Sequence, residues 1–192
     1  MSEPDASPPF VSRAGAKLDA AIEAFGIEVG GLICADLGSH TGGFVDCLLR
    51  RGAKRIYAVE RGRGVLHWRL RQDPRVVVCE GCSALHFRPP APVELVTIDL
   101  GWTPQRLAVP AALEMLAPAG RIVSLIKPQY ESDPTQRRGG VVTAEALEAV
   151  LEAVRGQLAT LDVRVEGWMR SPIRGSGGNV EALALLRAAG GG

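Results

Sequence analysis

Lysine is scarce in this sequence, and so are aromatic residues, cysteines and long apolar stretches. Of the 22 basic residues only three are lysines, namely Lys17, Lys54 and Lys127. Since the sequence uses arginine wherever a plain cation suffices, a lysine indicates a position that needs a compact ammonium or one able to lose its proton.

No apolar run reaches the roughly 18 residues that a membrane helix needs. The first residues are acidic and rich in proline, and they have neither the basic region nor the apolar region of a secretory signal. Both absences predict a cytoplasmic protein without a membrane partner. We expect residues 1–10 to form a disordered tail and residues 11–192 to form one domain.

The four cysteines give little sign of a metal site. Cys34 and Cys47 fall in an apolar run and on a predicted helix, where a buried, reduced thiol is expected. Cys79 and Cys82 have the CxxC spacing and His86 follows, but a zinc site normally needs a fourth ligand and the sequence offers no second pair. We therefore predict no bound metal.

The net charge of +1 does not indicate a nucleic-acid partner, but the positive charge is unevenly distributed along the sequence. Residues 50–75 hold nine cations against two acids, Glu60 and Asp73. Such a stretch can neutralise several phosphates, or it can be a solvated helix face, and the sequence leaves both interpretations open.

Apolar strands alternate with amphipathic helices along the chain. Helices are expected over residues 14–25, 42–51, 66–71 and 144–158, with a further one carrying Leu107, Leu113 and Leu116. Strands are expected over residues 32–37, 55–60, 76–79, 95–99, 122–127, 163–168 and 181–186. The last two strands have no helix between them and should pair antiparallel. The pattern predicts an α/β protein with the class I, Rossmann-like methyltransferase fold, a mostly parallel seven-stranded sheet whose last strand is antiparallel.

The first predicted strand runs into a glycine-rich turn with the pattern D-x-G-x-x-x-G-G, followed by an aromatic residue. The pattern is formed by Asp36, Gly38, Gly42, Gly43 and Phe44. A nicotinamide fingerprint would need a second glycine where this chain has His40, so a dehydrogenase is disfavoured. The turn, together with Glu60 at the end of the second strand as the expected partner of the ribose hydroxyls, favours S-adenosylmethionine. Ser83 is expected to border the adenine.

Three charged residues stand at the margins of apolar strands. Asp99 ends the fourth strand, Lys127 ends the fifth, and Glu181 opens the antiparallel last strand, so all three should lie at one edge of the sheet. Their placement destabilises the fold unless they pair or function. A structural cluster of salt bridges and a catalytic site are both compatible with it.

Several motifs together resemble the FtsJ/RrmJ-type ribose 2′-O-methyltransferases of RNA, most of all the TlyA (hemolysin A) family of rRNA methyltransferases. They lie at residues 11–18, 36–48, 57–60, 70–76, 97–99, 126–131 and 171–181. The resemblance implies S-adenosylmethionine as cofactor, RNA as substrate, ribosomal RNA in particular, and a Lys-Asp-Lys-Glu tetrad at Lys17, Asp99, Lys127 and Glu181. In that family's mechanism Lys127 accepts the proton of the 2′-hydroxyl. Lys17 and Glu181 orient it, and Asp99 lies against cofactor and substrate.

The chain also departs from that family. TlyA proteins carry an RNA-binding S4-type domain before the methyltransferase, where this chain has ten residues. The resemblance therefore leaves open which RNA is modified, what the oligomeric state is, and whether a separate RNA-binding partner or the ribosomal subunit replaces that domain. Trp102 stands where the family usually has Phe, and it either stacks on a target base or simply packs.

Two other functions are alternatives to methyl transfer. A non-catalytic RNA-binding or ribosome-assembly protein that retained the fold would be expected to have lost part of the tetrad, and all four residues are present. A pore-forming hemolysin, suggested by the family's historical name, is disfavoured because the sequence has no amphipathic membrane segment.

Overall fold

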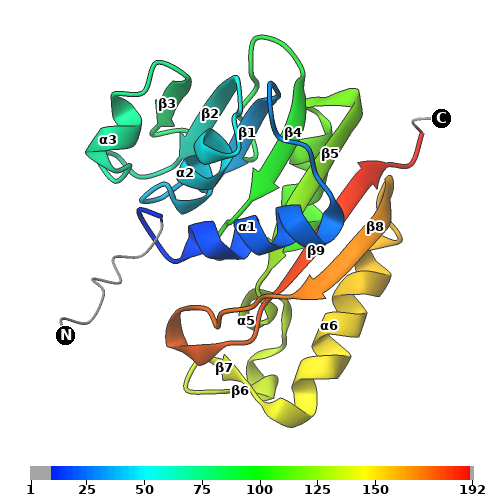
Figure 1. The fold of residues 1–192 in the computed structure, drawn as a ribbon. Coiled ribbons are helices and arrows are strands. Elements are labelled where there is room, and N and C mark those ends of the chain that lie inside the picture. The colour runs from blue at the N-terminus through cyan, green and yellow to red at the C-terminus, as the bar shows by residue number, and fades with distance from the viewer. Residues whose placement is uncertain (1–9, 191–192) are drawn as a thin grey trace, which may run out of the picture.

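A computed structural model describes residues 10–190 and shows a seven-stranded sheet between two layers of helices (Figure 1). The strand order is β3-β2-β1-β4-β5-β9-β8, and β9 is antiparallel to both of its neighbours. This topology confirms the predicted fold class. The strands are β1 (Ile33–Leu37), β2 (Arg55–Glu60), β3 (Val76–Glu80), β4 (Val93–Ile98), β5 (Leu116–Ile126), β8 (Val163–Arg170) and β9 (Ala182–Ala188).

Helices cover both faces of the sheet because alternate residues of the central strands are apolar on each side. On one face lie α1 (Ala14–Phe25), α2 (Gly43–Arg50) and the short α3 (Trp68–Arg71), with α1 in front of the sheet in Figure 1. The other face packs against α4 (Gln105–Leu113) and α6 (Ala144–Leu158). In β5, for example, Leu125 belongs to the first core and Ile126 to the second. None of the helices within residues 10–190 is long and apolar enough to cross a bilayer.

Two segments differ from the sequence prediction. The helix expected to include Leu116 ends at Leu113, and Leu116 instead opens β5, an eleven-residue strand that runs through Pro118 and Gly120. The segment after Lys127, where no helix or strand was expected before residue 144, contains the four-residue helix α5 (Pro128–Glu131), a 3₁₀ turn (Pro134–Gln136) and a small hairpin of β6 (Arg137–Arg138) and β7 (Val141–Val142).

The predicted tail also needs a correction at its boundary. Phe10 is buried, with the guanidinium of Arg50 5.1 Å from its ring centroid. It lies so close to Gly15 that a Cβ at that position would overlap the ring. Phe10 is therefore part of the folded domain, and the rest of the predicted tail, residues 1–9, lies outside the described residues together with residues 191–192.

Candidate active site

A cavity of about 540 Å³ opens at the carboxyl ends of β1, β2, β4 and β5. Seven of the eight residues predicted to bind the cofactor line it: Asp36, Gly38, Gly43, Phe44, Glu60, Ser83 and Asp99. Gly42, the eighth, does not. It precedes α2 with a φ of 103°, and a Cβ there would overlap Leu66 and Leu70, so Gly42 serves the packing of the α3 segment instead.

The glycine turn brings the backbones of β1 and β4 together at the cavity floor. Gly38 has a φ of +89°, and a Cβ on it would lie 2.6 Å from the carbonyl oxygen of Asp99. The amides of Gly38 and Ser39 both donate to the carbonyl of Val59, at 2.9 and 3.0 Å. Only glycine suits this position, because it combines a left-handed backbone with close approach of a second strand.

Asp36 is the buried acid of the cavity. Its Oδ1 accepts a hydrogen bond from Thr97 Oγ1 at 2.7 Å, while its Oδ2 and the hydroxyl of Ser39 have no hydrogen-bond partner among the described residues. Burial, opposed in part by the Thr97 bond, raises the pKa of Asp36 to about 8. Two unpartnered polar atoms beside a cavity suit a ligand with a cationic donor, such as the ammonium of a methionine moiety.

Replacing Asp36 with Asn is expected to change how stability depends on pH. Between the ordinary value of 3.8 and about 8, the folded protein keeps a proton that the unfolded chain has released, so Asp36 destabilises the fold increasingly as pH rises through this window. The stability of Asp36→Asn relative to wild type should therefore increase from about pH 4 to about pH 8 and then level off. Urea unfolding without cofactor across this range measures the difference, and a pH-independent difference would contradict the burial argument.

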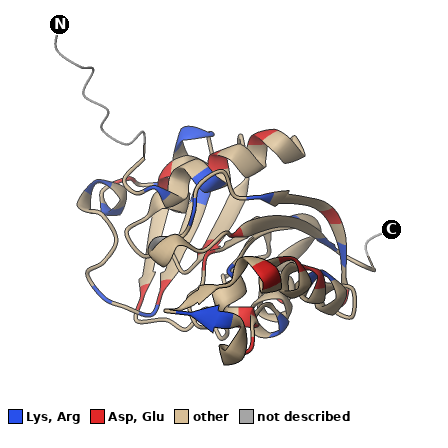
Figure 2. Ribbon diagram, turned by 90° about the horizontal axis from the view of Figure 1, so that it is seen from below, with Lys and Arg blue, Asp and Glu red and all other residues tan. Residues whose placement is uncertain are grey.

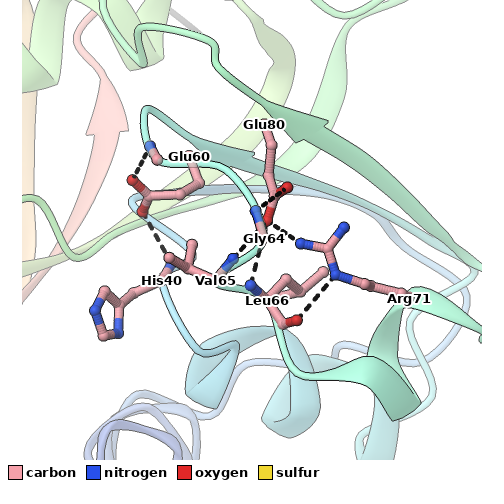
Figure 3. A network of polar contacts seen from close by, with 8 residues as sticks. His40, Glu60, Gly64, Val65, Leu66, Arg71 and Glu80 are labelled. Carbon is pink, nitrogen blue, oxygen red and sulfur yellow. Dashed lines mark hydrogen bonds and ion pairs between the residues drawn. The ribbon is translucent and has the colours of Figure 1, made fainter.

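Glu60 is held at the cavity edge by two backbone amides (Figure 3). Its Oε2 accepts from the amide of His40 at 3.0 Å and its Oε1 from the amide of Gly62 at 2.7 Å. A carboxylate has about four acceptor sites, so each oxygen can accept a further hydrogen bond from a diol. Ser83 lies on the exposed part of the same edge, on the loop that follows β3.

The four tetrad residues lie on one side of the sheet. Asp99, Lys127 and Glu181 each adjoin a residue that faces α4 and α6 (Ile98, Ile126 and Ala182). Side chains alternate along a strand, so all three point to the α1–α2 side, where Lys17 lies on α1. Ile126 pairs with Ala182 across β5 and β9, and this register brings Lys127 and Glu181 next to each other.

The tetrad forms two ion pairs with different accessibility. Lys127 Nζ lies 2.7 Å from Asp99 Oδ1, and both side chains line the cavity with 17% and 19% of their surface exposed. Lys17 Nζ lies 2.5 Å from Glu181 Oε2, and these side chains are only 10% and 3% exposed. The backbone of Gly175 packs so closely on the Glu181 carboxylate that a Cβ would overlap it. The Lys127–Asp99 pair therefore lines the cavity, whereas Lys17 and Glu181 are not among the residues that line it.

Sequence reasoning missed several cavity residues. Ser39 lies inside the glycine turn, where its polar side chain next to Gly38 was an available signal. Tyr130 packs its ring 4.8 Å from that of Trp102 and 6.0 Å from Lys127 Nζ, a contact that depends on how α5 folds back. Trp102 itself is 84% exposed at the cavity mouth, in a left-handed conformation with a φ of 59°. Its ring therefore packs against Tyr130 while most of its surface stays exposed.

The cysteines have the predicted free state. Cys34 and Cys47 are buried and unpaired by disulfides, and burial raises the pKa of Cys34 to about 12. Within residues 10–190 no group of three or more His, Cys, Asp or Glu side chains is placed to hold a metal ion.

Comparison with known proteins gives strong matches along the whole described chain. TlyA of Mycobacterium tuberculosis, a 16S/23S rRNA (cytidine-2′-O)-methyltransferase, is 40% identical over 188 residues, which make up 95% of this chain and 70% of TlyA. YqxC of Bacillus subtilis is 38% identical over 92% of this chain, which spans 65% of YqxC. A Streptococcus thermophilus structure assigned as a hemolysin is 36% identical, with a TM-score of 0.91 over 97% of this chain and 70% of that one.

The fold and the family follow from these matches. Several methyltransferase structures of only 15–18% identity share the fold, with TM-scores of 0.58–0.63. The sequence model of the FtsJ-like methyltransferase family matches residues 10–188 of this chain. The chain belongs to the FtsJ-like methyltransferase family, whose methyl donor is S-adenosylmethionine.

Proposed function

We propose that the protein methylates a ribose 2′-hydroxyl of RNA, with ribosomal RNA as the substrate. The observation that carries this proposal is the Lys127–Asp99 pair, which faces the cavity with the buried Lys17–Glu181 pair beside it. TlyA, which is 40% identical, is named for the same reaction on ribosomal RNA. A cytoplasmic location, predicted from the sequence, agrees with such a substrate.

The cavity residues suit the parts of S-adenosylmethionine, which supplies an electrophilic methyl group on a sulfonium when bound. Asp36, with its unpartnered Oδ2, would hold the ammonium, and the amide of Gly43, at the start of α2, would meet the carboxylate. Glu60 would accept the two ribose hydroxyls, and Ser83 would contact the adenine. In this assignment Phe44 closes the cavity beneath the methionine portion.

The reaction needs a group that removes the proton of the attacking hydroxyl. Lys127 is the proton acceptor in this proposal, since its amine reaches the cavity and must enter the reaction uncharged. Asp99 fixes the position of that amine through the 2.7 Å contact. Glu181 and Lys17 form a mutually neutral pair next to Lys127, so they orient the site without adding net charge.

A non-catalytic RNA-binding or ribosome-assembly role is the weaker alternative. The cavity is open, its buried acid has an unused acceptor, and all four tetrad side chains are paired, which a decayed active site would not maintain.

The proposal is tested by comparing ribosomal RNA from cells with and without the gene. Nucleoside mass spectrometry is expected to show one 2′-O-methylated nucleoside that disappears with the gene and returns with the wild-type copy but not with a Lys127→Ala copy. Identical modification patterns in all strains, in ribosomal and transfer RNA alike, would reject the proposal.

A further inference from the structure

The structure separates the nine cations of residues 50–75 into three groups. Four arginines are neutralised by acids: Arg50 by Asp46, Arg51 by Asp19 and Glu23, Arg71 by Glu80, and Arg75 by Asp73. The sequence alone did not distinguish these arginines from the rest. Their partners make them structural, which leaves five cations to explain.

The remaining five occupy opposite edges of the sheet. Lys54 and Arg55 are exposed at the start of β2, at the amino edge and away from the cavity. Arg61 and Arg63 follow the end of β2, where Arg61 lines the cavity, and Arg69 lies on α3, in a hollow lined also by Asp46 and Asp73. All three are exposed and none forms an ion pair with another described residue. Of these three arginines, Arg61 therefore lies at the active site, and Arg63 and Arg69 lie on the segment that leads away from it.

An exposed indole lies among these arginines. Trp68, the first residue of α3, is 62% exposed, and the ring of His67 stacks on it at 6.0 Å. Exposed aromatic rings flanked by arginines are typical of surfaces that bind single-stranded nucleic acid, because bases stack on the ring while guanidinium groups contact phosphates. We call Arg61, Arg63, Trp68 and Arg69 the α3 patch.

We propose that the α3 patch binds the RNA strand next to the target nucleotide, through phosphate contacts from the arginines and stacking of one base on Trp68. The inference rests on the proposed function for the identity of the ligand. Charges of both signs are interspersed over the helices in the view from below (Figure 2). Because the net charge is only +1, the overall electrostatic attraction for RNA is small, and binding depends on local positive patches such as this one.

The segment that carries the patch is held in place by one carboxylate (Figure 3). Glu80 accepts hydrogen bonds from the amides of Gly64, Val65 and Leu66, at 2.7, 3.1 and 3.2 Å, and also pairs with Arg71. These bonds, the Gly64 amide foremost, lower the pKa of Glu80, so it stays ionised near neutral pH. A preformed loop binds its ligand with less loss of conformational entropy.

The patch is also connected to the cofactor side of the cavity. The amide of His67 donates to the carbonyl of Thr41 at 3.0 Å, within the glycine turn. The guanidinium of Arg63 lies over Gly81, on the loop that precedes Ser83. These contacts fix the distance between the patch and the reacting centre. A fixed distance suits an RNA strand whose target ribose must be placed at Lys127.

The test compares two double variants that remove equal charge from the same stretch. Arg63→Gln/Arg69→Gln changes the patch, and Lys54→Gln/Arg55→Gln changes the opposite edge. Binding of a fluorescein-labelled RNA stem-loop is measured by anisotropy over a range of salt concentrations. The slope of log K against log salt should become shallower by about 1.4–1.8 in the patch variant, since each phosphate contact contributes about 0.7–0.9. The control slope should stay at the wild-type value.

The stacking contact has its own readout. Trp68→Ala is expected to weaken binding of the same RNA by about 5- to 140-fold, the equivalent of one base–aromatic stack. Trp68→Phe should keep most of the affinity. In methyl-transfer assays with bulk ribosomal RNA, the patch variants should raise KM for RNA and leave kcat unchanged.

Equal salt slopes for the two double variants, or unchanged affinity in Trp68→Ala, would overturn the proposal. Tight binding of the wild type to phosphatidylserine vesicles that is lost only in the patch variant would also overturn it, because the patch would then be a membrane surface. Methyl transfer by the wild type with patch-independent RNA binding rejects the patch alone. Patch-dependent RNA binding without any methyl transfer rejects the proposed function alone.

Discussion

Replacing Lys127 with alanine is expected to lower the single-turnover rate of methyl transfer by about 10²- to 10⁴-fold, the usual contribution of a positioned general base. The affinity for S-adenosylmethionine should stay close to wild type, because the proposed cofactor contacts come from Asp36 on β1, Glu60 on β2 and the start of α2 at Gly43. Rapid-quench transfer of a tritiated methyl group to ribosomal RNA measures the rate, and calorimetry measures the affinity.

The pH dependence distinguishes a proton acceptor from a residue that only positions the substrate. The wild-type rate should rise with pH, as is expected of general-base catalysis, and the Lys127→Ala rate should lose this dependence. Lys54→Ala, an exposed lysine at the far edge of the sheet, serves as the control and should behave like wild type. A Lys127→Ala protein that transfers methyl groups at the wild-type rate would show that another group accepts the proton.

The second large effect is expected at the buried Lys17–Glu181 pair. Lys17→Met leaves the Glu181 carboxylate buried without a partner and should destabilise the fold by about 3–5 kcal/mol, as breaking buried ion pairs does. The double variant Lys17→Met/Glu181→Gln removes both charges and should recover much of this loss. Urea unfolding of the wild type, the two single variants and the double variant gives the coupling energy directly.

Activity in the double variant shows whether this pair has more than a structural role. If it orients Lys127, the double variant should be nearly as stable as wild type yet transfer methyl groups far more slowly. If the pair is only a salt bridge of the core, activity should return together with stability. The second outcome would reduce the proposed tetrad to Asp99 and Lys127.

The main elements of the fold could be predicted because strands buried on both faces read as apolar runs, such as residues 122–126, and α6 has a clear helical period. The start of β5 could not, because Leu116 continues the leucine spacing of α4 while Pro118 and Gly120 suggest a loop. The β6–β7 hairpin depends on a distant side chain. Asn179 accepts from the amide of Val142 at 3.0 Å and donates to the carbonyl of Gly140 at 3.1 Å.

The site could be predicted only in part, for a similar reason. The ends of neighbouring strands must meet, so the proximity of Asp99, Lys127 and Glu181 follows from topology. Which lysine pairs with which acid depends on how α1 packs, and no local pattern contains that information. The same holds for the basic stretch, because its four neutralised arginines find acids on α1, α2, β3 and the turn before β3.

The central claim is that Lys127 and the acidic side chains around it activate a sugar hydroxyl. The position of the methyl group on the RNA tests this claim most directly. Ribosomal RNA labelled by the purified protein with tritiated S-adenosylmethionine is hydrolysed in alkali, which cleaves only where a free 2′-hydroxyl can attack the phosphate. The proposed function predicts label in an alkali-stable dinucleotide, and no label above background with Lys127→Ala. Label recovered in mononucleotides would place the methyl group on a base and contradict the account.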